Sequence, residues 1–221
     1  MSRVVADVAF YGLPLFLAAW TLHWRRAWAL LGVVALTTAV TVFSVYPQRP
    51  DLLEERSKTP VQKGQPAADK LLLLAQLVTF LGLLVFIALD ARRFHLLGAT
   101  RLPVATGGLI LFVAGAAMIT WAMRENAFAS AVVRHQEERG QVVVQSGPYG
   151  IVRHPMVAGS IPSTVGVALW LGSPAAALLA AAPIAVSVLR VIVEERVLRH
   201  ALPGYVDYAR SVRWRLVPHV W

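Results

Sequence analysis

The chain has no cysteine among its 221 residues. This absence excludes disulfides, cysteine nucleophiles and metal sites built on thiolates, and we expect no metal site at all. Charge is scarce as well, because only 15% of the residues are charged while 57% are hydrophobic, and the mean hydropathy is +0.60. A soluble domain of this length has a very different balance, so the composition indicates an integral membrane protein.

Long stretches of the chain contain no Asp, Glu, Lys or Arg. The last of them, Pro155 to Leu189, would be roughly 50 Å long as one helix and exceeds a hydrocarbon core of about 30 Å. We therefore expect it to fold back at "GSP", Gly172 to Pro174. The other four have about the 20 residues that one bilayer crossing needs: Val8 to Trp24, Ala27 to Gln48, Leu71 to Leu89 and Leu102 to Met123.

These stretches predict an all-α, polytopic transmembrane bundle of about six helices. Five crossings are the alternative, because Pro155 to Leu171 is short. The first stretch is too long for the apolar core of a signal peptide and has no convincing cleavage site, so we expect a retained helix.

The basic residues are distributed unevenly about these helices. If six helices alternate, 16 of the 21 Lys and Arg residues fall on the side of the N-terminus. This bias predicts that both termini lie in the cytoplasm, in a membrane that we expect to be a prokaryotic inner membrane. The positive charge thus reflects topology, and nucleic acid is not expected as a partner.

Polar chemistry has to be assembled from three segments on that side, residues 46–70, 124–154 and 190–221. In the first, "RPDLLEERSKTP" predicts a short amphipathic helix that lies along the interface. In the second, "GQVVVQSGPYG" is a strand or an extended loop. In the third, "LRVIVEERVLRH" continues the last helix until Pro203 and Gly204 break it.

Arg153 and His154 stand directly before the last apolar stretch, and Glu194 and Glu195 follow it. Taken alone, the first pair is explained by interfacial anchoring, and the second by surface pairing with Arg190 and Arg199. A hairpin, however, brings its two outer ends together, so we expect the two pairs to be neighbours. Together with Tyr149, Tyr205 and Tyr208 they form a pocket suited to a ligand with both charges and a flat ring, such as S-adenosylmethionine.

Several motifs stand on these segments: "NAFAS", "SGPYGIVRHPMVAG", "EERVL" and "LPGYVDYARSVRWRLVP", with "RPDLLEERSK" as weaker support. Together they resemble the isoprenylcysteine carboxyl methyltransferase family of membrane methyltransferases and its phospholipid methyltransferase relatives. The resemblance covers roughly the last hundred residues. One departure is Val157, where the family often has tyrosine.

No internal repeat or long linker is visible, so we expect one membrane domain with a hairpin at 155–193. The resemblance implies that residues 124–221 of this domain bind S-adenosylmethionine. Residues 1–123 would then supply four helices and the loop 46–70. Gly159 would allow close approach either of the ligand or of another helix. The residues implied to bind the cofactor are Tyr149, His154, Pro155, Gly159, Glu194, Glu195, Tyr205 and Tyr208, and those implied in catalysis are Arg153, Glu195, Arg213 and Arg215.

Methyl transfer from a sulfonium mainly requires alignment of donor and acceptor. An arginine would orient a carboxylate acceptor such as that of an isoprenylcysteine, whereas a carboxylate would serve an amine acceptor, and the sequence offers both. An apolar acceptor would explain why the enzyme is embedded in the membrane. We therefore expect a lipophilic or lipidated acceptor, and membrane lipids around the protein. A membrane reductase of the sterol reductase type is an alternative, although no glycine-rich dinucleotide fingerprint is present. A non-catalytic transporter or assembly factor is another.

Overall fold

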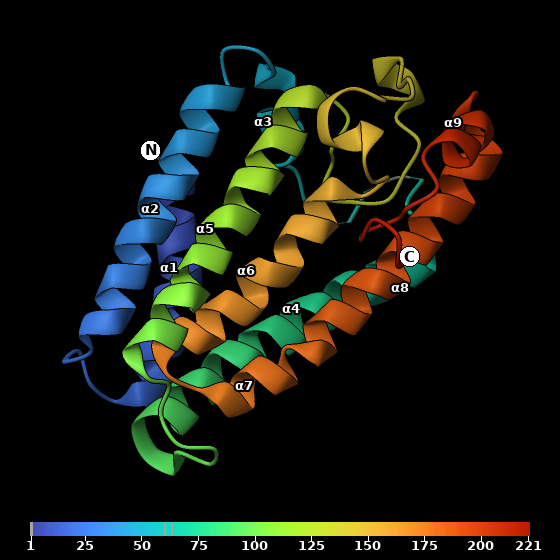
Figure 1. The fold of residues 1–221 in the computed structure, drawn as a ribbon. Coiled ribbons are helices and arrows are strands. Elements are labelled where there is room, and N and C mark those ends of the chain that lie inside the picture. Colours follow the sequence, from blue (N-terminus) through green and yellow to red (C-terminus); the bar gives the residue numbers. More distant parts are fainter. Residues whose placement is uncertain (1, 60, 63) are drawn as a thin grey trace.

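A computed structural model describes residues 2–59, 61–62 and 64–221. In this part of the chain all regular elements are helical, and they form a bundle of long helices that run side by side (Figure 1). The long elements are α1 (Ser2–Ala19), α2 (Arg25–Val45), α4 (Ala67–Leu89), α5 (Leu102–Glu125), α6 (Pro155–Leu171) and α8 (Ala181–Ala201), and the short ones are α3 (Pro50–Glu55), α7 (Pro174–Leu179) and α9 (Tyr205–Ser211). The predicted all-α bundle is confirmed.

Within the described residues, five helical segments are long and apolar enough to cross a membrane, and α6 is a shorter apolar helix. The outward faces of the long helices carry large apolar side chains, among them Leu17, Leu36, Leu74 and Ile110, which are all more than half exposed. Such a surface suits lipid contact, because exposed apolar area is favourable only where water is absent. The protein is an integral membrane protein.

One helix boundary differs from the one that the hydropathy pattern predicts. The first helix ends at Ala19, five residues before the expected end, because Trp20 takes a left-handed backbone with φ of 54°. A turn follows, in which the Thr21 hydroxyl accepts a hydrogen bond from the His23 amide at 3.1 Å. The last helix continues beyond the apolar hairpin to Ala201 and stops before Gly204, whose φ is 80°, as its helical period predicts.

The expected break at "GSP" is present. Gly172 adopts a φ of 101°, and the Ser173 hydroxyl accepts a hydrogen bond from the Ala176 amide as α7 begins. From there α7 and α8 return along the bundle, so that α6 and α8 form the two arms of a hairpin. The arms diverge, because α6 packs along α5 whereas α8 lies beside α4 (Figure 1).

The packing of α6 on α5 rests on facing glycines. A Cβ atom on Gly115 would lie 2.2 Å from the Gly159 carbonyl oxygen, and one on Gly166 would lie 2.4 Å from the Gly108 carbonyl oxygen. The two backbones are thus in direct contact, as in other small-residue contacts between membrane helices. This contact fixes α6 and the residues at its N-terminus.

One end of the bundle gathers the polar loops, and we call it the polar end: residues 46–59, 61–62, 64–66, 126–154 and 202–221. Ion pairs hold this end together. Arg134 contacts Glu55 of α3 at 2.9 Å, and Arg190 of α8 contacts Asp69 of α4 at 2.9 Å. Arg3 lies at this end too, in a cavity that Arg56 also lines, so both chain termini are on the same side. Which side of the membrane this is remains a prediction.

Of two local structures predicted in these loops, one lies elsewhere than expected and the other takes one of its two expected forms. The amphipathic segment forms α3, but Leu52 is fully buried against Met123 and Ala129 rather than lying on the interface. Residues 141–145 form an extended loop, which is one of the two alternatives that the sequence left open.

Candidate functional site

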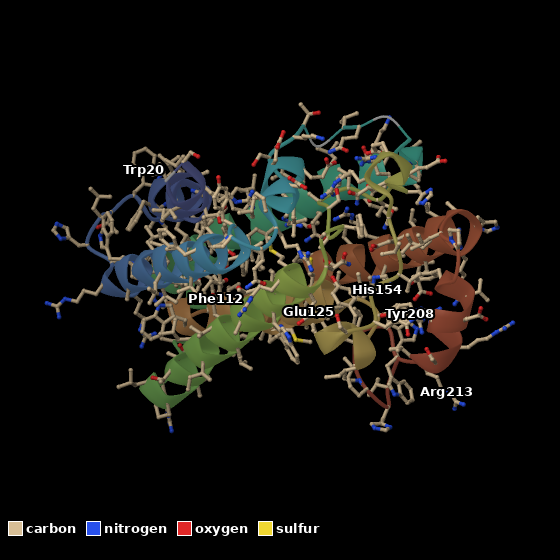
Figure 2. All side chains as sticks on the ribbon, turned by 90° about the horizontal axis from the view of Figure 1, so that it is seen from above. Trp20, Phe112, Glu125, His154, Tyr208 and Arg213 are labelled. Carbon is tan, nitrogen blue, oxygen red and sulfur yellow. The ribbon has the colours of Figure 1, made fainter. Side chains whose placement is uncertain are left out.

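A cavity of about 470 Å³ opens at the polar end, between α6, α8, α9 and the loop 126–145. Pockets of about 300 to 1,000 Å³ are typical of small-molecule sites. His154 and Tyr208 both line this cavity and lie inside the polar end in Figure 2, whereas Arg213 lies at its outer edge. The ends of the hairpin arms therefore form the walls of one cavity, as the sequence predicts.

The Arg153–His154 segment is held in place by the C-terminal tail. The Arg153 amide donates to the Trp214 carbonyl at 2.9 Å, and the His154 amide donates to the Arg215 carbonyl at 3.0 Å. Pro155 then begins α6, where its missing N–H costs nothing because the first turn of a helix has no acceptor for it. The tail thus clamps this segment against the bundle before α6 starts.

Glu195 is the centre of a buried ionic cluster beneath the cavity. Its carboxylate accepts a hydrogen bond from Arg153 Nε at 2.7 Å and one from Arg215 Nε at 3.1 Å, and it lies 3.3 Å from His154 Nε2. The side chains of Arg153 and Glu195 are only 3% and 4% exposed. A pair so enclosed positions the segment rather than meeting a ligand, since a buried charge needs its partner.

Arg153 is held in the same way on its other side. Its Nη1 donates to the Val212 carbonyl at 2.7 Å and to the Arg213 carbonyl at 2.8 Å. These bonds tie the end of α9 to the start of α6. Arg153 lines the cavity, yet three of its hydrogen bonds are made within the protein.

Glu194 is placed differently from its neighbour. Its side chain is 39% exposed, lines the cavity and lies 3.4 Å from His154 Nδ1. Burial lowers the pKa of His154, but the nearby carboxylates of Glu194 and Glu195 outweigh this and raise the pKa to about 9. An imidazolium between two carboxylates follows, and Glu194 is the one that a ligand can reach.

Two tyrosines of α9 form the opposite wall. The Tyr208 hydroxyl donates to the Tyr149 carbonyl at 2.8 Å, whereas the buried Tyr205 hydroxyl has no hydrogen-bond partner within the described part of the chain. Burial raises the pKa of both phenols, so they are neutral donors. Burying a hydroxyl without a hydrogen-bond partner costs desolvation free energy. A bound ligand that accepts a hydrogen bond from Tyr205 removes this cost.

Of the residues predicted for the site, seven line the cavity: Tyr149, Arg153, His154, Pro155, Glu194, Tyr205 and Tyr208. Gly159 lies at the contact with α5 instead, where a Cβ would be 2.7 Å from the Gly115 carbonyl oxygen, so the structure favours its packing alternative. Glu195 lies below the cavity, and Arg215 pairs with it and stacks on Trp221 at 4.8 Å. Arg213 is exposed and does not line the cavity.

The surface pairing proposed for the two glutamates is present in part. Arg199 approaches Glu195 at 3.7 Å, but Arg190 pairs with Asp69 rather than with Glu194. Asp69 is fully buried and also accepts from the Val133 amide at 3.0 Å. The Arg190–Glu194 expectation is wrong because a buried carboxylate on α4 competes for the same guanidinium.

The sequence also missed several residues that line the cavity. Asn126 and Arg56 stood within quoted motifs but received no role, and Gln76 and Ser187 lie inside apolar stretches that gave no signal. Val157, the position where relatives often have tyrosine, lines the cavity too. Its smaller side chain leaves more of this wall open.

The cavity walls made by α6 and α8 lie within a segment that matches a known family. Residues 104–203 match the phospholipid methyltransferase family. The match confirms the resemblance to membrane methyltransferases and supports a membrane methyltransferase. No curated protein matches the chain. The phospholipid methyltransferase match includes α5 to α8 but not α1 to α4 or α9, so Arg56, Tyr205 and Tyr208 lie outside it.

Proposed function

We propose that the protein transfers a methyl group from S-adenosylmethionine to a lipophilic acceptor. The observation that carries this proposal is the cavity at the polar end, which brings His154, Glu194 and Tyr205 together within a bundle whose C-terminal half matches a methyltransferase family. We further propose that the polar end faces the cytoplasm, because most of the basic residues gather there.

The residues of the cavity fit the proposed methyl donor. S-adenosylmethionine carries an ammonium, a sulfonium and a carboxylate beside a ribose and an adenine. The partly exposed carboxylate of Glu194 suits the cationic groups or the ribose hydroxyls. The free hydroxyl of Tyr205 suits an acceptor atom of the ligand, and Tyr149 offers a buried ring face.

When bound, the sulfonium supplies an activated methyl group that is transferred in one displacement. The protein's own contribution is positioning, which is worth a large part of such a barrier. The ionic cluster around Glu195 fixes the start of α6, and the tail covers it, so that the cavity wall is rigid before any ligand binds. The apolar bundle holds the acceptor at the same end and excludes bulk water.

The direct test is incorporation of label from S-adenosylmethionine into a lipid extract by the purified protein, with titration calorimetry of the cofactor alone beside it. We expect both incorporation and binding. Binding of a reduced nicotinamide dinucleotide instead of S-adenosylmethionine would contradict the proposal and favour a reductase.

A matched pair of tyrosine variants probes the site itself. Tyr205→Phe removes a hydroxyl that makes no bond in the described protein, so stability should not fall. The affinity for S-adenosylmethionine should fall about 2- to 13-fold, the equivalent of one hydrogen bond of about 0.5 to 1.5 kcal/mol. Tyr208→Phe is the control: it removes a bond to the Tyr149 carbonyl and should lower stability instead. Unchanged affinity in Tyr205→Phe would remove Tyr205 from the site.

A further inference from the structure

A second cavity, of about 290 Å³, lies deeper in the bundle, between α1, α2, α4, α5, α6 and α8. Phe112, labelled in Figure 2, lines it, as do apolar residues of several helices. Among the residues lining it are many polar ones: Arg3, Asp7, Tyr11, Thr37, Thr38, Thr41, Arg56, Gln76, Ser160, Ser163, Thr164 and Ser187. A site for a purely apolar chain would not need them, so part of its occupant is polar.

The two cavities meet. Five residues line both of them, namely Arg56, Gln76, Ile119, Ser160 and Ser187. Their shared walls form a junction between the cavity at the polar end and the cavity inside the bundle. A molecule in the deeper cavity would therefore lie close to a methyl donor in the other cavity, and the two would meet at this junction.

Arg56 is the charged residue among those that line both cavities, and its surroundings differ from those of three other arginines near the site. Arg134, Arg153 and Arg190 each contact a buried carboxylate. Arg56 donates from Nη1 to the Ala129 carbonyl at 2.8 Å and makes no ion pair within residues 2–59, 61–62 and 64–221. Burial and the positive charge of Arg3 lower the pKa of Arg56 to about 10, so the site itself leaves this charge poorly compensated.

Among the described residues that line the deeper cavity, the one carboxylate, that of Asp7, already has partners. Asp7 lies 3.5 Å from Arg3 and accepts a hydrogen bond from the Thr38 hydroxyl at 3.0 Å. Because the charges of Arg3 and Asp7 compensate each other, the positive charge of Arg56 is left without a compensating carboxylate. A desolvated guanidinium of this kind favours an anion, and its planar fork matches the two oxygens of a carboxylate or a phosphate.

We infer that Arg56 binds an anionic group, a carboxylate or a phosphate, of an amphiphilic acceptor whose remainder occupies the deeper cavity. The inference rests on the proposed function for the identity of this molecule as the methyl acceptor. It makes Arg56 a specificity-determining residue that lies on the loop after α3, outside the segment that matches the family. Gln76, Ser160 and Ser187 surround the same junction with neutral hydrogen-bonding groups.

The test uses amphiphiles with one twelve-carbon chain and different head groups: dodecyl phosphate, dodecanoate and dodecyltrimethylammonium. Each is titrated at pH 8 into the full chain in a neutral detergent, and thermal unfolding is followed by tryptophan fluorescence. A ligand that binds the folded state raises the unfolding temperature in a concentration-dependent way. We expect at least one of the anionic probes to stabilise the wild type and the cationic probe not to.

Arg56→Gln should raise the probe concentration needed for half of the stabilisation tenfold or more. Arg49→Gln is the matched control, because Arg49 also flanks α3 and donates to a backbone carbonyl, that of Arg124, but lines neither cavity. It should behave like the wild type. Arg56→Lys keeps the charge and replaces Arg56→Gln in the test if the latter does not fold. The anionic probes should stabilise Arg56→Lys less than the wild type, because lysine lacks the planar fork.

The probes also distinguish the two sources of the anion. Stabilisation by dodecyl phosphate alone indicates a phospholipid head group, and stabilisation by dodecanoate alone indicates a lipidated carboxylate. An equal response to all three probes in the wild type, or an unchanged response in Arg56→Gln, would overturn the inference. If the preference for anions depends on Arg56 but no methyl group is incorporated, the inference stands and the proposed function falls.

Discussion

Glu194 and Glu195 are neighbours in sequence, yet replacing each by glutamine should have opposite consequences. In Glu195→Gln the guanidinium of Arg153, only 3% exposed, loses the carboxylate that lies 2.7 Å away. Leaving a buried charge unpaired costs about 3 to 5 kcal/mol. For a protein of this size each kcal/mol lowers the unfolding temperature by about 2 to 4 °C, so a decrease of about 6 to 20 °C is expected.

Glu194→Gln should leave the unfolding temperature within about 4 °C of the wild type. Its side chain is 39% exposed, so water screens its pair with the buried His154, and such a pair is worth only about 0 to 1 kcal/mol. The affinity for S-adenosylmethionine should fall tenfold or more, because Glu194 is the carboxylate that lines the cavity.

Thermal unfolding in detergent and titration calorimetry on both variants measure these effects. The double variant Arg153→Met/Glu195→Gln provides a check, because removing the orphaned charge should restore part of the lost stability. Equal unfolding temperatures in the two single variants would refute the reasoning, since the cluster around Glu195 would then contribute nothing to stability.

Three further predictions concern pH, packing and topology. The pKa of His154 is raised from about 6.5 to about 9. The contribution of protonated His154 to stability is therefore complete below pH 6.5 and is lost as the pH rises through 9. Between these two pH values the unfolding temperature of His154→Gln should fall less than that of the wild type. Gly115→Val should reduce folded yield in size-exclusion profiles because its side chain meets the Gly159 carbonyl, whereas Gly107→Val, at a position with open space, should not. A reporter that is active only in the cytoplasm should be active when fused after Trp221, and activity of a periplasmic reporter there would reverse the proposed orientation.

The sequence predicts those parts of the site that follow from topology. Once Pro155 to Leu189 has to fold back, Arg153 and His154 must approach Glu194 and Glu195, and the structure brings them together. The sequence does not show which glutamate faces the cavity, because consecutive residues on a helix point about 100° apart and only the packing of α8 sets its rotation.

Contacts between distant segments could not be predicted from the sequence, because they also depend on how the helices pack. Asp69 draws Arg190 away from Glu194 because α4 and α8 lie side by side, an arrangement that hydropathy does not encode. The role of Gly159 also depends on helix packing, because the sequence does not show which helix lies against this glycine. Arg56 lies in a motif, but its place at the junction appears only when α1, α5 and α8 are assembled around it.

The backbone contact between α5 and α6 bears on how the proposed lipophilic acceptor would enter from the membrane. With carbonyls of Gly159 and Gly108 pressed against the partner helix, the pair behaves as one stiff body that cannot part without losing the contact. A lateral opening has to form along another seam. The helices α7 and α8 join at Ala180, whose backbone is right-handed helical, so we expect them to move as one hairpin arm while α5 and α6 stay together. We expect spin labels on α8 to report larger distance changes upon lipid binding than labels placed across the glycine contact.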